Sequence, residues 1–271
     1  MSDANPYQPA GPEPLVEVPS GELQIRRVSI RPIELMKRAY ALMGDQYMLM
    51  VGVTLVGILV GSLVPMGIIM GAMMVGIFMC FMQREQFGRT EFGALFKGFD
   101  FFLDSFLVML IATALSFVVI FPSYLLMVAI MFGAMAGTQE NPDAAVGVML
   151  VIMPVFFILM MVAMLLIYLP FLFSFQLIAD RHLTAMDAVK YSWRASIKNL
   201  LGIIWHLFVV SLITYIAALA CYIPAFFVIP ITFGSMFVLY RDIFGPGTFP
   251  PPPLTQGYAV QPPAGPPPAA S

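Results

Sequence analysis

The chain has 271 residues, of which 60% are hydrophobic and 10% are charged, and its net charge is −2. Soluble domains carry about 25% charged residues, so this composition excludes an ordinary soluble protein and indicates an integral membrane protein. The slightly negative charge argues against nucleic acid as a partner.

The two ends of the chain are rich in proline. Residues 1–28 have neither the basic start nor the apolar stretch of a cleavable signal peptide, so we expect the first membrane segment to direct insertion. Residues 244–271 carry no charge, and we expect both tails to be disordered. The C-terminal tail is either a solvated chain, the favoured interpretation, or a polyproline ligand for a protein partner.

Four stretches between the tails contain no Asp, Glu, Lys or Arg. They are residues 46–83, 105–139, 144–179 and 199–240. A membrane-spanning helix needs about 20 apolar residues, so the first and last stretches are each long enough for two spans. Prolines at Pro65 and Pro224 mark a turn within each of these two. Each middle stretch is either one overlong span or two short ones.

The loop between the two middle stretches favours one crossing each. It contains Glu140 and Asp143 but no basic residue, whereas cytoplasmic loops are enriched in Lys and Arg. With one crossing each, the loop faces outward and all 13 Lys and Arg lie in the cytoplasm. The sequence thus predicts six spans in a bacterial cytoplasmic membrane, with both termini cytoplasmic. The spans cover residues 47–63, 66–83, 105–136, 148–179, 200–220 and 223–241. The two long spans are expected to tilt, kink or break at Pro122, Pro154 and Pro170.

Residues 29–243 contain a weak threefold repeat. Each unit has a helix start, an aromatic residue, a charged residue five positions later, and then a polar residue before two spans. These positions are, unit by unit, Ser29, Tyr40, Asp45 and Gln46; Thr90, Phe99, Asp104 and Ser105; and Thr184, Trp193, Lys198 and Asn199. We therefore expect an all-α integral membrane fold of three hairpin-like units, each preceded by an amphipathic cytoplasmic helix.

The three surface helices have apolar faces at helical spacing. The faces comprise Ile33, Met36, Tyr40, Met43 and Tyr47; Phe92, Leu95, Phe99, Leu103 and Phe106; and Met186, Val189, Trp193 and Ile197. Basic residues accompany them, and these are candidates for contact with lipid headgroups or a partner: Lys37, Arg38, Lys97, Lys190, Arg194 and Lys198. Such helices either lie in the membrane interface or pack against the protein's own bundle.

Few residues suggest chemistry. His206 and Gln176 lie inside membrane runs and are a candidate intramembrane polar site, although His206 follows Trp205 and is expected near the interface. The charged group around His182 is better explained by a span end followed by a Thr184–Asp187 helix cap. No hydrolase, phosphate-binding or zinc-protease motif is present, so we expect no enzyme activity, cofactor or metal.

Two segments carry a family resemblance: "FGALFKGFDFF" at 92–102 and "LIADRHLTAMDAVKYSWRASIKNLLG" at 177–202. Over residues 30–242 the chain resembles uncharacterised bacterial multi-pass inner-membrane proteins related to the membrane domain of some glycerophosphodiester phosphodiesterases. The phosphodiesterase barrel is missing, so no catalytic residue carries over. The resemblance implies a cytoplasmic-membrane protein.

Two functions are compatible with these features. The preferred expectation is a non-enzymatic structural or accessory protein that engages membrane lipid or a partner at the cytoplasmic leaflet. The alternative is a permease or lipid-handling transporter with a pathway between the three units. Its polar lining would be Thr54, Ser62, Ser116, Ser174, Gln176, Ser211, Thr214 and Tyr215. An open polar cavity would favour the transporter, and a core filled with Met and Leu would favour the first.

Overall fold

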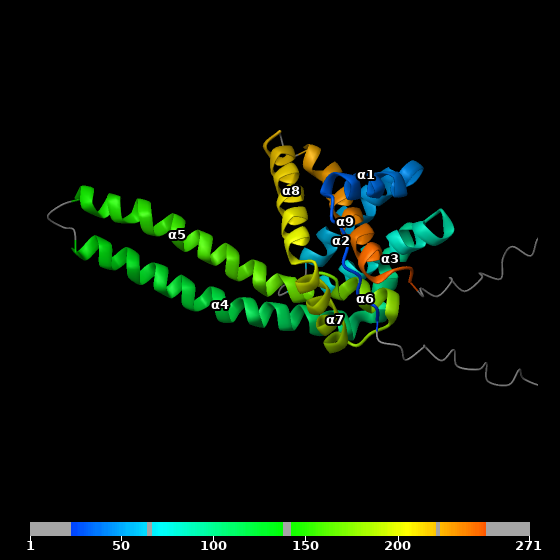
Figure 1. Ribbon diagram of the computed structural model, residues 1–271, viewed down its shortest axis with the longest axis horizontal. Helices are drawn as coiled ribbons and strands as arrows, with labels where there is room; N and C mark the ends of the chain where they lie inside the picture. The colour runs from blue at the N-terminus through cyan, green and yellow to red at the C-terminus, as the bar shows by residue number, and fades with distance from the viewer. Residues whose placement is uncertain (1–22, 64–66, 138–141, 221–222, 248–271) are drawn as a thin grey trace, which may run out of the picture.

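The computed structural model describes residues 23–63, 67–137, 142–220 and 223–247 (Figure 1). The secondary structure in these ranges consists of α-helices and 3-10 helices, and the ranges contain no β-strand. Five stretches of the described chain are long and apolar enough to cross a membrane: Pro32–Leu63, Phe92–Ala134, Leu150–Arg181, Leu200–Leu219 and Ile223–Phe244. The expected all-helical membrane protein is therefore confirmed at this level.

Several sequence predictions fall outside the described residues. These predictions concern most of both tails, including the C-terminal segment that could bind a protein partner. They also concern the turns near Pro65 and Pro224, of which residues 64–66 and 221–222 are not described. Residues 23–28, which the sequence assigned to the N-terminal tail, do have defined positions. They run extended along the end of the last helix, where the backbone N–H of Arg26 donates to the carbonyl of Ile243 at 2.9 Å.

The first part of the chain forms α1 (Pro32–Met43), a 3-10 turn (Gly44–Gln46), α2 (Tyr47–Leu63) and α3 (Met70–Phe87). The predicted span 66–83 corresponds to α3, which is not among the five apolar stretches. Its last turns hold four consecutive polar residues from Gln83 to Gln86, and these lower its mean hydropathy. Most of its side chains are buried, because α2, α4, α6 and α9 pack around it.

The second part begins with η3 (Phe92–Phe101), a 3-10 helix where the sequence predicted an amphipathic surface helix. It lies on α3 at very close range. A Cβ added to Gly98 would come within 2.1 Å of the carbonyl oxygen of Ala72, and only glycine fits there.

The long middle helices are α4 (Phe102–Gly137) and α5 (Pro142–Tyr168), followed by the 3-10 turn η4 (Leu169–Phe171) and α6 (Ser174–Arg181). Both α4 and α5 are single continuous helices through Pro122 and Pro154. Among the three prolines where a kink or break was expected, only Pro170 interrupts a helix.

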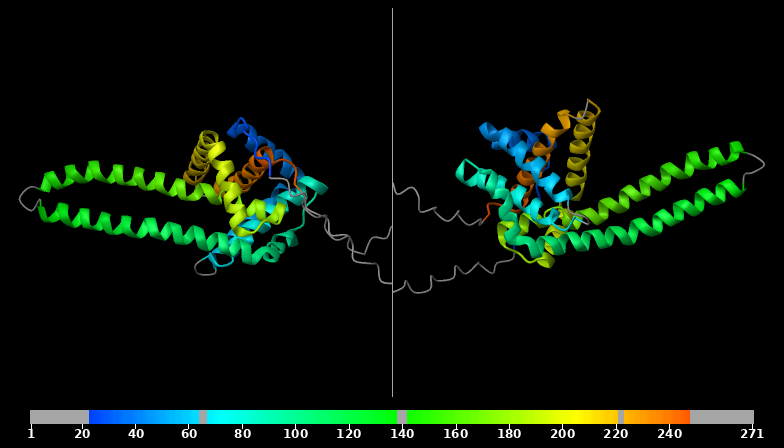
Figure 2. Two further views of the ribbon diagram at one scale, coloured as in Figure 1. Left: turned by 60° about the horizontal axis from the view of Figure 1, so that its bottom comes forward. Right: turned by 180° about the vertical axis from the view of Figure 1, so that it is seen from behind.

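The α4–α5 pair extends far from the rest of the molecule, as both figures show (Figures 1 and 2). Large apolar side chains such as Phe117, Phe157 and Met161 are exposed along it. No other described element covers its outer part. A surface of this size and apolarity requires apolar surroundings, which a bilayer supplies.

The third part consists of α7 (Ala185–Lys198), α8 (Leu200–Leu219) and α9 (Ile223–Phe244). The predicted cap at Thr184 is confirmed, since its hydroxyl accepts the backbone N–H of Asp187. α8 packs against α9, and α9 also packs along α1.

The packing follows a cyclic order. The last helix of each predicted unit contacts the surface helix of the next: α3 contacts η3, the η4 turn before α6 contacts α7, and α9 contacts α1. Aromatic side chains pack between these regions in the core. The ring centroids of Phe81 in α3 and Phe237 in α9 lie 5.9 Å apart, and those of Phe173, just before α6, and Tyr240 in α9 lie 6.5 Å apart.

Candidate functional site

The charged ends of α3, α6 and α9 meet in a buried cluster. Asp180 is fully buried, and its Oδ2 accepts hydrogen bonds from the hydroxyl of Tyr240 at 2.7 Å and from Nη1 of Arg241 at 3.0 Å. Nε of the neighbouring Arg181 lies 3.2 Å from the same oxygen. The cluster therefore joins α6 to the end of α9.

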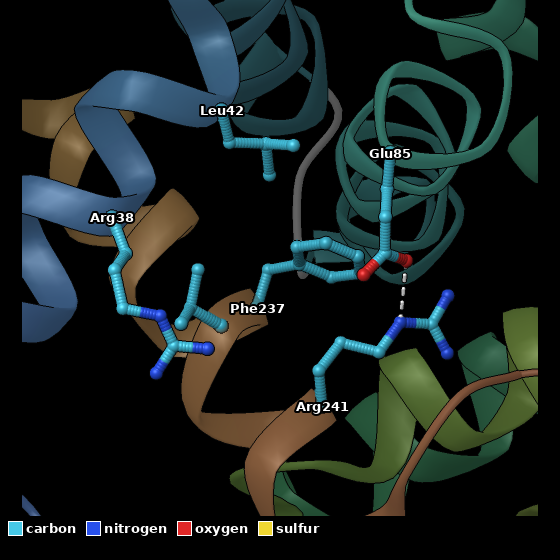
Figure 3. A pocket seen from close by; sticks show the side chains of 6 residues that line it. Arg38, Leu42, Glu85, Phe237 and Arg241 are labelled. Carbon is cyan, nitrogen blue, oxygen red and sulfur yellow. Dashed lines mark hydrogen bonds and ion pairs between the residues drawn. The ribbon is translucent and has the colours of Figure 1, made fainter.

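Arg241 extends the cluster to α3. Its Nε donates to Glu85 at 2.7 Å, and its guanidinium lies 5.1 Å from the centre of the Phe237 ring (Figure 3). With Asp180 and Arg181, the cluster holds two carboxylates and two guanidinium groups, which balance in charge. Buried ions are costly unless they are paired, so these groups depend on one another. We interpret the cluster as a structural clamp.

A small cavity of about 170 Å³ opens beside Arg241 and Glu85. Figure 3 shows Arg38, Leu42 and Phe237 around it. The guanidinium of Arg38 forms a bidentate pair with Asp242, at 2.7 and 2.8 Å. Each charged group that lines this cavity is thus already in an ion pair. The Arg38–Asp242 pair joins α1 to α9, and the Arg241–Glu85 pair joins α3 to α9.

His182 ends α6 in the left-handed conformation, with φ of 51°, and its ring lies 5.3 Å from that of Phe101. In the described ranges, no group of three His, Cys, Asp or Glu side chains has an arrangement that could hold a metal ion.

His206 and Gln176, the candidate intramembrane polar pair, lie on different helices. His206 is buried in α8, and its Nε2 lies 3.2 Å from the hydroxyl of Ser235 in α9. Gln176 is buried in α6, and its amide has no hydrogen-bond partner within the described chain. The two side chains therefore do not form one hydrogen-bonded site.

The surface helix α7 buries its small face rather than its large apolar one. In α7 the buried residues are Ala185, Ala188, Ser192, Ala195 and Ser196. The predicted apolar face is instead largely exposed at Met186, Trp193 and Ile197. Small side chains allow helices to approach closely, so they form the contact with the bundle.

The other two surface helices, η3 and α1, bury some small residues but also some large apolar ones. In η3, Ala94 and Gly98 are buried while Phe92 and Phe96 are exposed. Two members of the predicted apolar faces, Leu95 and Met43, do pack into the core. The aromatic residues that correspond in the repeat are all accessible, with Tyr40 57%, Phe99 39% and Trp193 39% exposed.

Two serines fix α7 to the break at Pro170. The hydroxyl of Ser192 accepts the backbone N–H of Phe173 at 3.0 Å. The hydroxyl of Ser196 donates to the carbonyl of Leu169 at 2.9 Å. These bonds could not be predicted from the sequence, because both serines look like ordinary polar positions on a surface helix.

All six basic candidates are exposed, and Arg38 is paired with Asp242 as described. The other five are Lys37, Lys97, Lys190, Arg194 and Lys198. Lys190 lies 3.4 Å from Asp187, and the guanidinium of Arg194 lies 5.9 Å from the Tyr191 ring centre. Lys198 donates to the carbonyl of Ile25 at 2.6 Å.

A side chain that follows each surface helix within a few residues accepts a hydrogen bond from the backbone close to the start of the next one. Gln46 accepts from Thr90 N–H at 2.7 Å, and Asp104 accepts from Ala185 N–H at 2.9 Å. The third such bond joins Asn199 to the N-terminal segment. The sequence analysis did not predict these three hydrogen bonds. In the threefold repeat, Gln46 and Asn199 occupy the same position, and Asp104 occupies the position before it.

Comparison with known proteins yields no relative: the chain matches no protein-family model, no curated protein and no solved structure. The resemblance to the membrane domain of glycerophosphodiester phosphodiesterases therefore stays a prediction.

Proposed function

We propose that this chain is a non-enzymatic, six-span protein of a bacterial cytoplasmic membrane, related to the membrane domain of glycerophosphodiester phosphodiesterases. Its surface helices α1, η3 and α7 engage membrane lipid at the cytoplasmic leaflet and make it a structural or accessory protein there. The observation that carries the proposal is the exposure of Tyr40, Phe99 and Trp193, one on each surface helix, close to basic side chains.

The exposed faces suit the membrane interface. Aromatic side chains concentrate at the level of the headgroups, and a Lys or Arg near anionic lipid contributes about 1 kcal/mol of binding. Small residues hold α7 against the bundle, whereas η3 and α1 also bury Leu95 and Met43. In all three helices at least one aromatic side chain and the basic side chains stay exposed. A helix fixed in this way anchors the protein without a deep binding pocket.

The six-span topology adds α3 to the five apolar stretches. α3 is enclosed by other helices and needs little apolar exterior of its own. The ends of α3 and α6, at Glu85 and Asp180, meet Arg241 near the end of α9, which supports three returning helices that finish on one side. Basic residues gather there, and this favours the cytoplasmic side with both termini.

The cyclic junctions support three hairpin-like units. The α4–α5 pair would be the second hairpin, with its exposed apolar surface covered by acyl chains. α4 has 36 residues and is therefore about 54 Å long, against a hydrocarbon core of about 30 Å. The pair would cross with a strong tilt, or with its first turns at the interface.

The permease alternative has less support. Much of its proposed polar lining is bonded to the backbone one turn earlier in the chain. The hydroxyls of Thr54, Ser62, Ser116, Ser174 and Thr214 each donate to the carbonyl four residues earlier. The buried core is filled by large apolar side chains such as Met50, Met73, Phe81 and Phe237. We therefore favour the accessory role.

Fluorescence of Trp193 tests the proposal, because the chain has only two tryptophans. In a Trp205→Phe variant reconstituted into vesicles, lipids brominated near the headgroup should quench Trp193 more strongly than lipids brominated near the chain end. The Trp193→Phe variant, which reports Trp205 alone, identifies the contribution of α8. Absence of quenching by either lipid would place Trp193 in water or under a protein partner and would reject lipid engagement by α7.

A further inference from the structure

A second hollow lies where the N-terminal segment crosses the junction of α7 and α8. Its volume is about 460 Å³, and the residues lining it include Arg27, Val28, Ile197, Lys198, Leu201 and Ile204. Ligand pockets typically have volumes of about 300–1,000 Å³. The hollow is thus large enough for a lipid headgroup and the beginning of an acyl chain.

The polar side of the hollow is cationic. It holds Arg27 and Lys198, and none of the described residues that line it is acidic. Arg27 is exposed and makes no hydrogen bond or ion pair within the described chain. Lys198 donates once, to the carbonyl of Ile25, and its ammonium group keeps two further N–H donors. The start of α8 at Leu200 adds the positive end of a helix dipole.

The other side of the hollow is apolar and continues down α8. Leu201, at its mouth, is 84% exposed, the highest value among the exposed large apolar side chains. Trp205 follows one turn later, and its ring stacks on that of Phe208 at 5.7 Å. Leu212 extends this exposed face further. A cationic rim above an apolar stripe on a candidate membrane span has the two parts needed to bind a phospholipid.

We propose that this hollow binds one anionic phospholipid of the cytoplasmic leaflet. Its phosphate would contact Arg27 and Lys198, and an acyl chain would lie along Leu201 and Trp205. This inference rests on the proposed membrane function and names the lipid class and the residues for it. A soluble anion would satisfy the cations but leave the apolar stripe uncovered, so a lipid fits the whole site better.

The rest of the basic stripe on α7 serves as the matched control. Lys190 has Asp187 beside it, and Arg194 lies over Tyr191. Neither is among the residues that line the hollow, so in detergent, where no layer of headgroups surrounds α7, neither should contact the retained lipid. Replacing both by glutamine removes the same two charges as replacing Arg27 and Lys198, from the same region but outside the site.

Native mass spectrometry of the full chain, released from detergent, provides the test. With phosphatidylglycerol titrated against phosphatidylcholine, the unmodified protein should retain one phosphatidylglycerol. The Arg27→Gln/Lys198→Gln variant should bind it about 30-fold more weakly, and the Lys190→Gln/Arg194→Gln variant within about twofold of the unmodified protein. Equal losses in both variants would show charge attraction without a site and would overturn the inference.

Single substitutions keep the test decisive if the double variant does not fold. Arg27→Gln alone, at an exposed side chain without a partner, should weaken binding about fivefold. Leu201→Gln should weaken retention of phosphatidylglycerol while leaving the position of Trp193 unchanged. Complete displacement of the lipid by millimolar inorganic phosphate would identify a simple anion site and overturn the assignment to a phospholipid.

The two proposals fail separately. If Trp193 is quenched by shallow brominated lipids but no lipid is retained at the hollow, the membrane function stands and the lipid site is wrong. If Trp193 is not quenched in any vesicle, the proposed function of α7 at the leaflet fails, whatever mass spectrometry reports.

Discussion

The side chain of Asn199 closes the molecule on itself. Its Oδ1 accepts the backbone N–H of Val28 at 3.0 Å, across 171 residues of sequence, and its Nδ2 donates to the carbonyl of Arg26 at 3.1 Å. Gln46 and Asp104 make the corresponding contacts at the other two junctions. The three surface segments are therefore linked in a ring, each one fastened to the start of the next.

The ring predicts that Asn199 contributes to stability. Asn199→Ala leaves the N–H of Val28 without its partner, and a partly buried donor of this kind costs about 1–3 kcal/mol when unsatisfied. The free energy of unfolding in mixed micelles, followed by circular dichroism, should fall by that amount. Asn199→Asp keeps the oxygen acceptor and should lose less. Equal losses for the two variants would contradict this role of the Oδ1 acceptor.

The buried ion cluster predicts a ranking of substitutions. Asp180→Ala leaves Arg181 and Arg241 without their shared carboxylate, and we expect the free energy of unfolding to fall by about 3–5 kcal/mol. Tyr240→Phe removes one hydrogen bond to Asp180 and should cost about 1 kcal/mol. The same micelle unfolding measurement applies. A Tyr240→Phe variant as unstable as Asp180→Ala would argue that packing, not charge pairing, dominates at this point.

Close contact between α3 and η3 predicts a sharp effect at Gly76. A Cβ there would lie 1.9 Å from the carbonyl oxygen of Leu95, so Gly76→Ala must push the two helices apart, at a cost of about 1–3 kcal/mol. Gly52 in α2 is the matched control, since a Cβ there meets nothing within 4 Å. Gly52→Ala should be neutral or stabilise by up to about 1 kcal/mol. Thermal unfolding of both variants, side by side, separates packing from helix propensity.

The six-span topology predicts where single cysteines react. In a background with Cys80→Ala and Cys221→Ser, Gln139→Cys lies in the acidic loop and Lys190→Cys on the exposed face of α7. A maleimide that cannot cross the membrane should label the first only from outside the cell and the second only from the cytoplasm. Labelling of both positions from the same side would refute the six-span arrangement.

The sequence by itself determined the elements whose causes are local. The charge-free stretches identified the apolar helices, because a bilayer excludes unpaired ions. The start of α7 followed from Thr184 and Asp187, whose cap involves residues only three positions apart. Of the expected helix breaks, only Pro170 interrupts a helix, since continuation through Pro122 depends on the neighbours of α4.

Only the tertiary structure decided which face of each surface helix is buried. Hydrophobicity alone favours burial of Trp193 and Ile197, yet Ala188 and Ser192 face the bundle because small side chains permit close backbone approach. The partners of Asp180 were likewise hidden, since Tyr240 lies 60 residues away in sequence. Local patterns give the helices and their polarity, whereas contacts between distant helices depend on how closely their backbones fit, which no local pattern records.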